Sequence, residues 1–296
     1  MRRTLGFIVA LLAMLLGTAP LAAAGAPGPV DPGVPTARLD PAANAAADPL
    51  TVLARPRVTG TPRFGRVLRA VAPRWSAMPR QVTRQWLRDG TPIAGARGKH
   101  YRIRPRDVGH RLRVRYLATG PDGADVVAAS KPRRILHRVP VRRVVRYSVE
   151  TRGRIVADLA MFKRLARETF ADPRGWRAAG VEFRQVGKGG AMTLVLAEAS
   201  KVPSFSSACS AEWSCRVGRF VVINQTRWRF ASPAWRKGDG TLRDYRHMVV
   251  NHESGHFLGR GHSSCPRRGA LAPVMQQQSK GLGGCRFNPW PTATER

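Results

Sequence analysis

The stretch from His252 to His262 constrains this chain most, because it reads H-E-x-x-H-x-x-G-x-x-H. Residues four apart share one face of a helix, so His252 and His256 can direct two imidazoles at one metal ion. Glu253 lies one step round and can reach a metal-activated water. Gly259 permits a sharp exit from the helix, which lets His262 return as a third ligand. The segment therefore predicts a helix, a turn and a return around one cation.

Three protein ligands with one open position are typical of a catalytic zinc site, whereas four ligands close a structural one. The added glycine and third histidine make a chance match much rarer than for H-E-x-x-H alone. The alternative is a polar helix end with incidental histidines. We interpret His247, upstream of the motif, as a surface residue or a neighbour of the ligands, not a ligand.

The extended motif resembles that of the metzincin clan of zinc metallopeptidases, which also have a methionine in a tight turn beneath the metal. The resemblance implies that Met275, two residues after Pro273, is this Met-turn residue. An ordinary core methionine is the alternative. The resemblance also implies an α+β metzincin-like catalytic domain at 139–296, with a twisted sheet and a zinc helix.

A wider similarity covers about half of the chain, from Tyr147 to Trp290. It rests on CRVGR (215–219), VINQ (222–225), DYRHMVVNHE (244–253) and APVMQQQSKG (272–281). These pieces resemble a secreted actinobacterial family that has the same histidine motif. That family supports the metzincin-like fold and supplies no known substrate.

The first residues are typical of export. Residues 1–24 read as a signal peptide with a basic start, an apolar run at 7–16 and a small-residue cleavage site at 22–24. The run is short for a membrane span, and a retained signal anchor is the alternative. Residues 25–50, rich in Ala, Pro and Gly, predict a linker. We expect a secreted or cell-surface protein.

Four cysteines fit an exported protein, in which disulfide bonds form. Three connectivities are possible, and the local loops favour Cys209–Cys215 and Cys265–Cys285. The second bridge would tie the segment after the third histidine to the segment after Met275. The spacings contain no C-x-x-C, which disfavours a cysteine zinc site.

The net charge of +33 comes mostly from arginine. Compositional bias of the genome accounts for it as readily as selection does. In either case, Arg-rich faces will attract anionic wall polymers or membrane headgroups. An export signal and the lack of a basic helix or aromatic strand platform argue against nucleic acid as the partner.

Residues 51–138 predict an all-β module. Apolar and arginine residues alternate at 66–71, 82–87 and 111–116, as in strands with one buried face. Asp89-Gly90 predicts a hairpin turn. A wider pattern resembles bacterial immunoglobulin-like surface modules: Trp86, Asp89, Gly90, Ile93, Tyr101, Asp107, Gly109, Leu112 and Val114. Trp86 would fill the core of a sandwich. The module would act as a spacer or, through its arginines, in adhesion.

In residues 139–296 the periodicity predicts strands before the zinc helix, with one helix among them. We expect strands at 144–150, 181–186, 192–197 and 218–223, a helix at 156–172, and a helix capped by Thr241 that runs to about Leu258. The residues after Gly259 predict turns and little regular structure.

Together these features predict a zinc metalloendopeptidase with one Zn²⁺ held by His252, His256 and His262. Glu253 would act as the general base. Tyr245 and nearby arginines are candidates for a second oxyanion donor, although a core or surface role is the alternative. The same centre would also suit hydrolysis of a wall cross-link. A second class of function is a polyanion-binding surface protein with a structural zinc and no turnover.

Overall fold

The computed structural model describes residues 48–238 and 240–296, so the expected signal peptide and nearly all of the expected linker lie outside the described residues. Within them, one apolar core is built from residues between 68 and 135, and another from residues between 145 and 275. No helix in these two ranges is both long and apolar enough to cross a bilayer.

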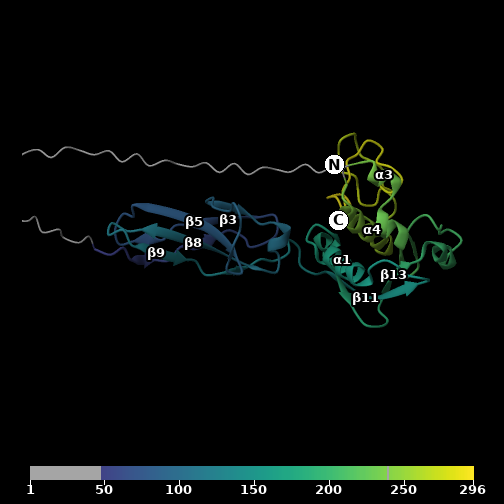
Figure 1. Cartoon of the computed structure of the whole chain (residues 1–296), viewed down its shortest axis with the longest axis horizontal. Helices are drawn as coiled ribbons and strands as arrows, with labels where there is room; N and C mark the ends of the chain where they lie inside the picture. Colours follow the sequence, from purple (N-terminus) through teal and green to yellow (C-terminus); the bar gives the residue numbers. More distant parts are fainter. Residues whose placement is uncertain (1–47, 239) are drawn as a thin grey trace, which may run out of the picture. The chain divides into compact units, whose positions relative to one another are not determined.

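Residues 48–138 form three β-sheets (Figure 1). Their strands are β1 (Val52–Ala54), β2 (Arg57–Thr59), β3 (Val67–Val71), β4 (Arg74–Trp75), β5 (Gln81–Arg88), β6 (Thr91–Pro92), β7 (His100–Arg102), β8 (Arg111–Thr119), β9 (Asp125–Ala129) and β10 (Arg133–Arg134). The largest sheet has the order β10-β8-β5-β6, with β9 also paired to β8. A second sheet is β2-β3-β7, and β1 pairs with β4.

Alternating burial explains the largest sheet. In β8, Leu112 and Val114 are buried while Arg111 and Arg115 are exposed, as the period-two pattern predicts. Trp86 has no exposed surface and lies in the core. Asp89 and Gly90 both have positive φ, 46° and 89°, as a two-residue turn that continues into β6 requires.

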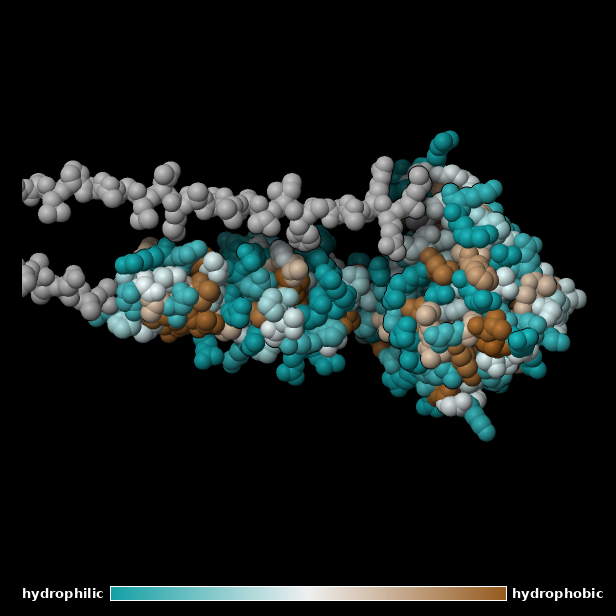
Figure 2. All heavy atoms as spheres, in the orientation of Figure 1, coloured by the Kyte–Doolittle hydropathy of each residue, from teal (hydrophilic) through white to brown (hydrophobic). Residues whose placement is uncertain are grey.

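Figure 2 shows hydrophilic residues over much of the visible surface, with smaller apolar patches between them.

Residues 139–296 form one five-stranded sheet with helices packed on it (Figure 1). The elements are β11 (Arg143–Arg152), α1 (Leu159–Ala171), β12 (Val181–Gln185), β13 (Met192–Ala197), β14 (Cys215–Val217), β15 (Phe220–Asn224), α2 (Gln225–Phe230), α3 (Pro233–Arg236) and α4 (Leu242–Phe257), with short 3₁₀ turns between some of them. The strand order is β12-β11-β13-β15-β14. The first four strands are parallel, and β14 runs antiparallel to β15.

Both faces of the central strands are covered. On one face, Leu194 and Ile223 pack in the core that α1 and α4 complete. On the other face, Val195 and Val222 pack with Val202 of the 3₁₀ turn after β13. Every residue of β13 is buried for this reason, because a strand covered on both faces has no solvent side.

In residues 139–296, two predicted starts lie too early. Helix α1 starts at Leu159, three residues later than expected, because the Asp158 carboxylate accepts a hydrogen bond from the Met161 amide and caps it. The strand expected at 218–223 starts at Phe220, because Gly218 (φ 52°) turns the chain between β14 and β15. Strand β14 itself was not expected, since three residues are too few for a periodic signal.

Candidate metal centre

Helix α4 brings the motif together. The Thr241 hydroxyl accepts a hydrogen bond from the Asp244 amide and caps the helix as predicted. The Asp244 carboxylate accepts from the Thr241 hydroxyl, not from its backbone amide as a full capping box requires. The helix ends at Phe257, and Gly259 (φ 87°) reverses the chain towards His262.

The three imidazoles converge. The Nε2 atom of His256 lies 3.2 Å from the Nε2 atoms of His252 and His262, and all three ligand atoms lie within 4.8 Å of one another. Nitrogen ligands about 2.0–2.1 Å from a tetrahedral zinc ion would be about 3.3 Å apart. The distances therefore fit three ligands on one zinc ion.

The tautomers of two of these histidines follow from their neighbours. The Nδ1 atom of His252 lies 2.8 Å from the carbonyl oxygen of Val274, and that of His256 lies 2.8 Å from the carbonyl oxygen of Arg260. A carbonyl only accepts, so each Nδ1 has the proton and each Nε2 has a lone pair. Burial lowers the pKa of both histidines, that of His252 to about 3, which opposes a second proton. The short Nε2–Nε2 distances therefore bring unprotonated nitrogen atoms together. A cation between them would relieve the repulsion of their lone pairs.

Glu253 lines the same cavity as the three histidines. The residue is 5 % exposed, and no hydrogen bond or ion pair to its carboxylate is present among the described residues. Burial raises the pKa of this carboxyl to about 8 in the metal-free chain. The carboxyl is thus free to exchange a proton with a molecule in the cavity near neutral pH.

The cavity has a volume of about 550 Å³. Its walls come from α4, from the segment around Gln277, and from the loop that leads into β14. Arg216 of β14 donates a hydrogen bond from its guanidinium to the carbonyl oxygen of His256, 2.8 Å away. Trp213 stands in the β14 loop with the Arg227 guanidinium over its ring. Arg216 is one of the nearby arginines, which were predicted only as a group as candidate oxyanion donors, and no role was predicted for Trp213.

The floor of the site is a tight turn, in which the Gln276 amide donates to the carbonyl oxygen of Pro273. Met275 in this turn is 1 % exposed. It packs so closely under α4 that a Cβ atom added to Gly255 would lie 2.3 Å from its sulfur. Gly255, between two of the histidines, is therefore required for this contact, which the sequence pattern did not indicate.

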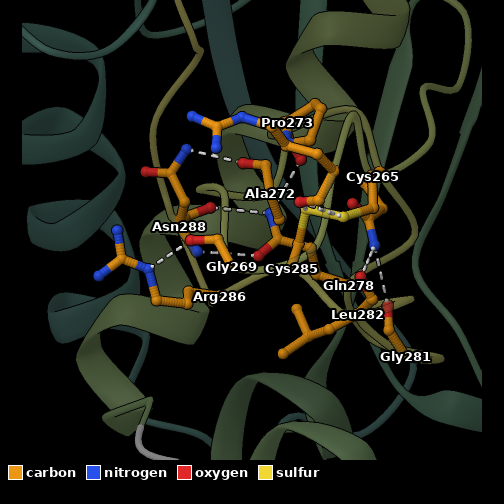
Figure 3. Close-up of a disulfide and its surroundings, with 12 residues drawn as sticks. Cys265, Gly269, Ala272, Pro273, Gln278, Gly281, Leu282, Cys285, Arg286 and Asn288 are labelled. Atoms are coloured by element: carbon orange, nitrogen blue, oxygen red, sulfur yellow. Dashed lines mark hydrogen bonds between the residues drawn. A yellow bond between two sulfur atoms is a disulfide. The ribbon is translucent and has the colours of Figure 1, made fainter.

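Both favoured cysteine pairs lie at bonding distance, Cys209 with Cys215 and Cys265 with Cys285. Figure 3 shows the second pair beside loops that are joined to one another by hydrogen bonds. There the buried Gln278 amide donates to the carbonyl oxygens of Pro273 and Asn288. The bridge joins the segment after His262 to the segment after Met275, as the spacing predicted.

His247 and Tyr245 are both buried. Of the two alternatives for His247, a surface residue or a neighbour of the ligands, the first is wrong, because it is 6 % exposed, its Nδ1 lies 2.8 Å from the Thr169 hydroxyl, and its ring packs on Trp290. It does not belong to the histidine cluster. Tyr245 lines the cavity, but its hydroxyl is 3.0 Å from the Ser279 hydroxyl.

Comparison with known proteins gives a family. The profile of a family described as "Protein of unknown function (DUF3152)" matches residues 136–292, more than half of the chain. The chain therefore belongs to this family. A search of curated proteins finds no match.

Proposed function

We propose that this protein is an exported zinc metallopeptidase of metzincin-like fold. The observation that carries the proposal is the convergence of three imidazole nitrogens in a cavity beside a free carboxyl group. Four protein ligands would close a structural zinc site, whereas three leave one position for a substrate or water. Met275 would then be the Met-turn residue beneath the metal.

His252, His256 and His262 would hold the zinc ion. When bound, zinc lowers the pKa of a water molecule towards neutrality and polarises the carbonyl group of a substrate. Glu253 accepts the proton of the attacking water and passes it to the leaving amine. The carbonyl groups of Val274 and Arg260 hold the Nδ1 protons of two of the ligands and so keep their lone pairs directed at the metal.

Strand β14 supports a peptide as the substrate. It is the edge strand of the sheet, and Cys215 and Arg216 line the cavity. Among the described residues its second edge pairs with no strand. An extended peptide can add to such an edge through main-chain hydrogen bonds, which would lay a scissile bond along the cavity.

The rival function is a polyanion-binding protein with a structural zinc ion and no turnover. The charge of +33 favours binding to anionic wall polymers or headgroups, with either function. The free carboxyl group of Glu253 favours the peptidase, because a structural site needs ligands and no base.

The test is digestion of a peptide library by the purified protein, with and without a zinc chelator. Wild type should cleave and should stop when the metal is removed. Glu253→Ala should retain zinc and the folded state, and its kcat should fall by about 10²–10⁴-fold, the usual contribution of a general base.

The matched control is Glu182→Ala, which removes a glutamate of β12 that pairs with Arg184. Its activity should equal that of wild type. If Glu253→Ala cleaves as well as wild type, or if chelation leaves cleavage intact, the peptidase proposal is wrong.

A further inference from the structure

Glu295 is a buried carboxylate that the proposed reaction does not use. It is 7 % exposed and makes no ion pair within the described part of the chain. Burying a charge without a partner is costly unless hydrogen bonds satisfy it. Four donors do so: the amides of Val274, Met275 and Thr292 and the hydroxyl of Thr292, at 2.7–3.0 Å.

Two of these donors lie in the turn beneath the histidines. The Met275 amide is 2.7 Å from Oε1 of Glu295, and the Val274 amide is 3.0 Å from Oε2. The carboxylate thus holds both residues at the centre of the turn. The Glu295 side chain thus connects the last residues of the described chain to the turn at the floor of the metal centre.

One peptide group joins this carboxylate to a metal ligand. The carbonyl of Val274 and the amide of Met275 belong to the same peptide unit. Its oxygen accepts the Nδ1 proton of His252 at 2.8 Å, while its N–H donates to Glu295. A negative charge on the N–H side polarises the peptide and makes its oxygen a stronger acceptor, since linked hydrogen bonds reinforce one another.

We propose that Glu295 is a positioning residue for the metal centre, acting on His252 through the Val274–Met275 peptide. A carboxylate that orients a ligating histidine usually contacts the imidazole directly and raises its basicity. Here the peptide stands between the two groups and transmits both position and charge. The inference rests on the proposed zinc site, because it assigns Glu295 a role in metal affinity.

The test measures the zinc dissociation constant by competition with a chromophoric chelator, for wild type, Glu295→Gln and Glu295→Asp. Removing a partner of this kind costs 10–100-fold in metal affinity, and we expect about 10-fold for Glu295→Gln. Glu295→Asp retains the charge but shortens the side chain, so its loss should be smaller. The visible spectrum of the cobalt-loaded Gln variant should also shift.

Thr292→Val is the matched control, because it removes one hydrogen bond to the same carboxylate and leaves the charge and the Met275 contact. Its zinc affinity should match wild type. A purely structural Glu295 would lower the melting temperature of the metal-free variants and leave zinc affinity and the cobalt spectrum unchanged, which overturns the inference. If Glu295→Gln does not fold, the affinity of Glu295→Asp decides. Failure of wild type to bind zinc would instead overturn the proposed function.

Discussion

At the scale of single residues, burial sets the chemistry of the centre. Glu253 and His252 are adjacent in the sequence and both buried, but burial moves their pKa values in opposite directions, because it disfavours the charged form of each. In the metal-free chain the carboxyl therefore stays protonated and the imidazole stays neutral near pH 7. Neither group therefore adds net charge to the buried site of the metal-free chain.

This burial predicts a pH effect on the stability of the metal-free protein. The pKa of Glu253 rises from 4.5 to about 8 on folding, so its stabilising contribution is full below pH 4.5 and is lost as pH rises to 8. Between pH 6.5 and 8, stability should fall by about 2 kcal/mol, at about 1.4 kcal/mol per pH unit.

The measurement is the unfolding free energy by urea titration, in chelator, for wild type and Glu253→Gln. The histidines with lowered pKa values oppose folding as pH falls through 6.5, and because this effect is present in both proteins it cancels in their difference. The difference between the two proteins should change by about 2 kcal/mol from pH 6.5 to 8. A constant difference would show that Glu253 is ionised in the folded chain.

The close contact at Gly255 predicts an overpacking effect. A Cβ atom there would lie 2.3 Å from the Met275 sulfur and 2.7 Å from the Trp176 ring. Gly255→Ala should cost about 1–3 kcal/mol, although alanine is the better helix former. Gly261→Ala, where nothing lies within 4 Å, is the control and should change stability by less than about 0.5 kcal/mol. Thermal unfolding of both variants checks this, and equal effects would contradict the packing argument.

At the scale of elements, the site depends on how α4 ends. The convergence of His252 and His256 needs only the helical repeat, whereas that of His262 needs the chain to reverse at Gly259. The Gly259 amide donates to the carbonyl of His256, and the Arg260 amide to that of Gly255. These bonds close the helix and place the carbonyl of Arg260 against Nδ1 of His256.

Substitution of Gly259 should therefore weaken metal binding in a chain that still folds. Its φ of 87° is strained for other residues, although no atom lies within 4 Å of a Cβ there. Gly259→Ala should cost about 1–2 kcal/mol and weaken zinc binding. Gly259→Asn should lose less, because asparagine tolerates the left-handed region. Chelator competition ranks the three proteins, and equal affinity for Ala and Asn would contradict backbone strain as the cause.

At the scale of the whole molecule, charge is the dominant property. The sequence has 51 Lys and Arg residues against 18 Asp and Glu, and arginines such as Arg111 and Arg115 stand on the exposed side of β8. Hydrophilic residues cover much of the surface in Figure 2. Such a surface attracts polyanions over a distance set by the salt concentration.

Binding to anionic vesicles should therefore be strong at low salt and should be lost in 1 M NaCl, where the Debye length falls to about 3 Å. Zwitterionic vesicles are the control and should retain little protein at any salt concentration. Co-sedimentation of wild type and Glu253→Ala measures this. The two proteins should bind alike, because the attraction is independent of the reaction. Salt-insensitive binding would point to apolar insertion instead.

The sequence by itself determined the local features. The helical repeat places His252 and His256 on one face, Gly259 allows the turn, and Thr241 caps the helix, all within one stretch of chain. The cysteine pairing also followed, because each bridge closes a local loop. Short-range geometry of this kind depends only on bond angles and spacing.

Only the tertiary structure decided which distant residues contact the histidine cluster and the helix that carries it. The Val274 carbonyl on His252, the Glu295 carboxylate behind it, and Arg216 on the end of α4 have no spacing that marks them. Strand β14, at the edge of the sheet, was likewise too short to leave a periodic signal. Contacts between segments far apart in sequence depend on how sheet, helix and loops pack, and that packing is a property of the whole folded chain.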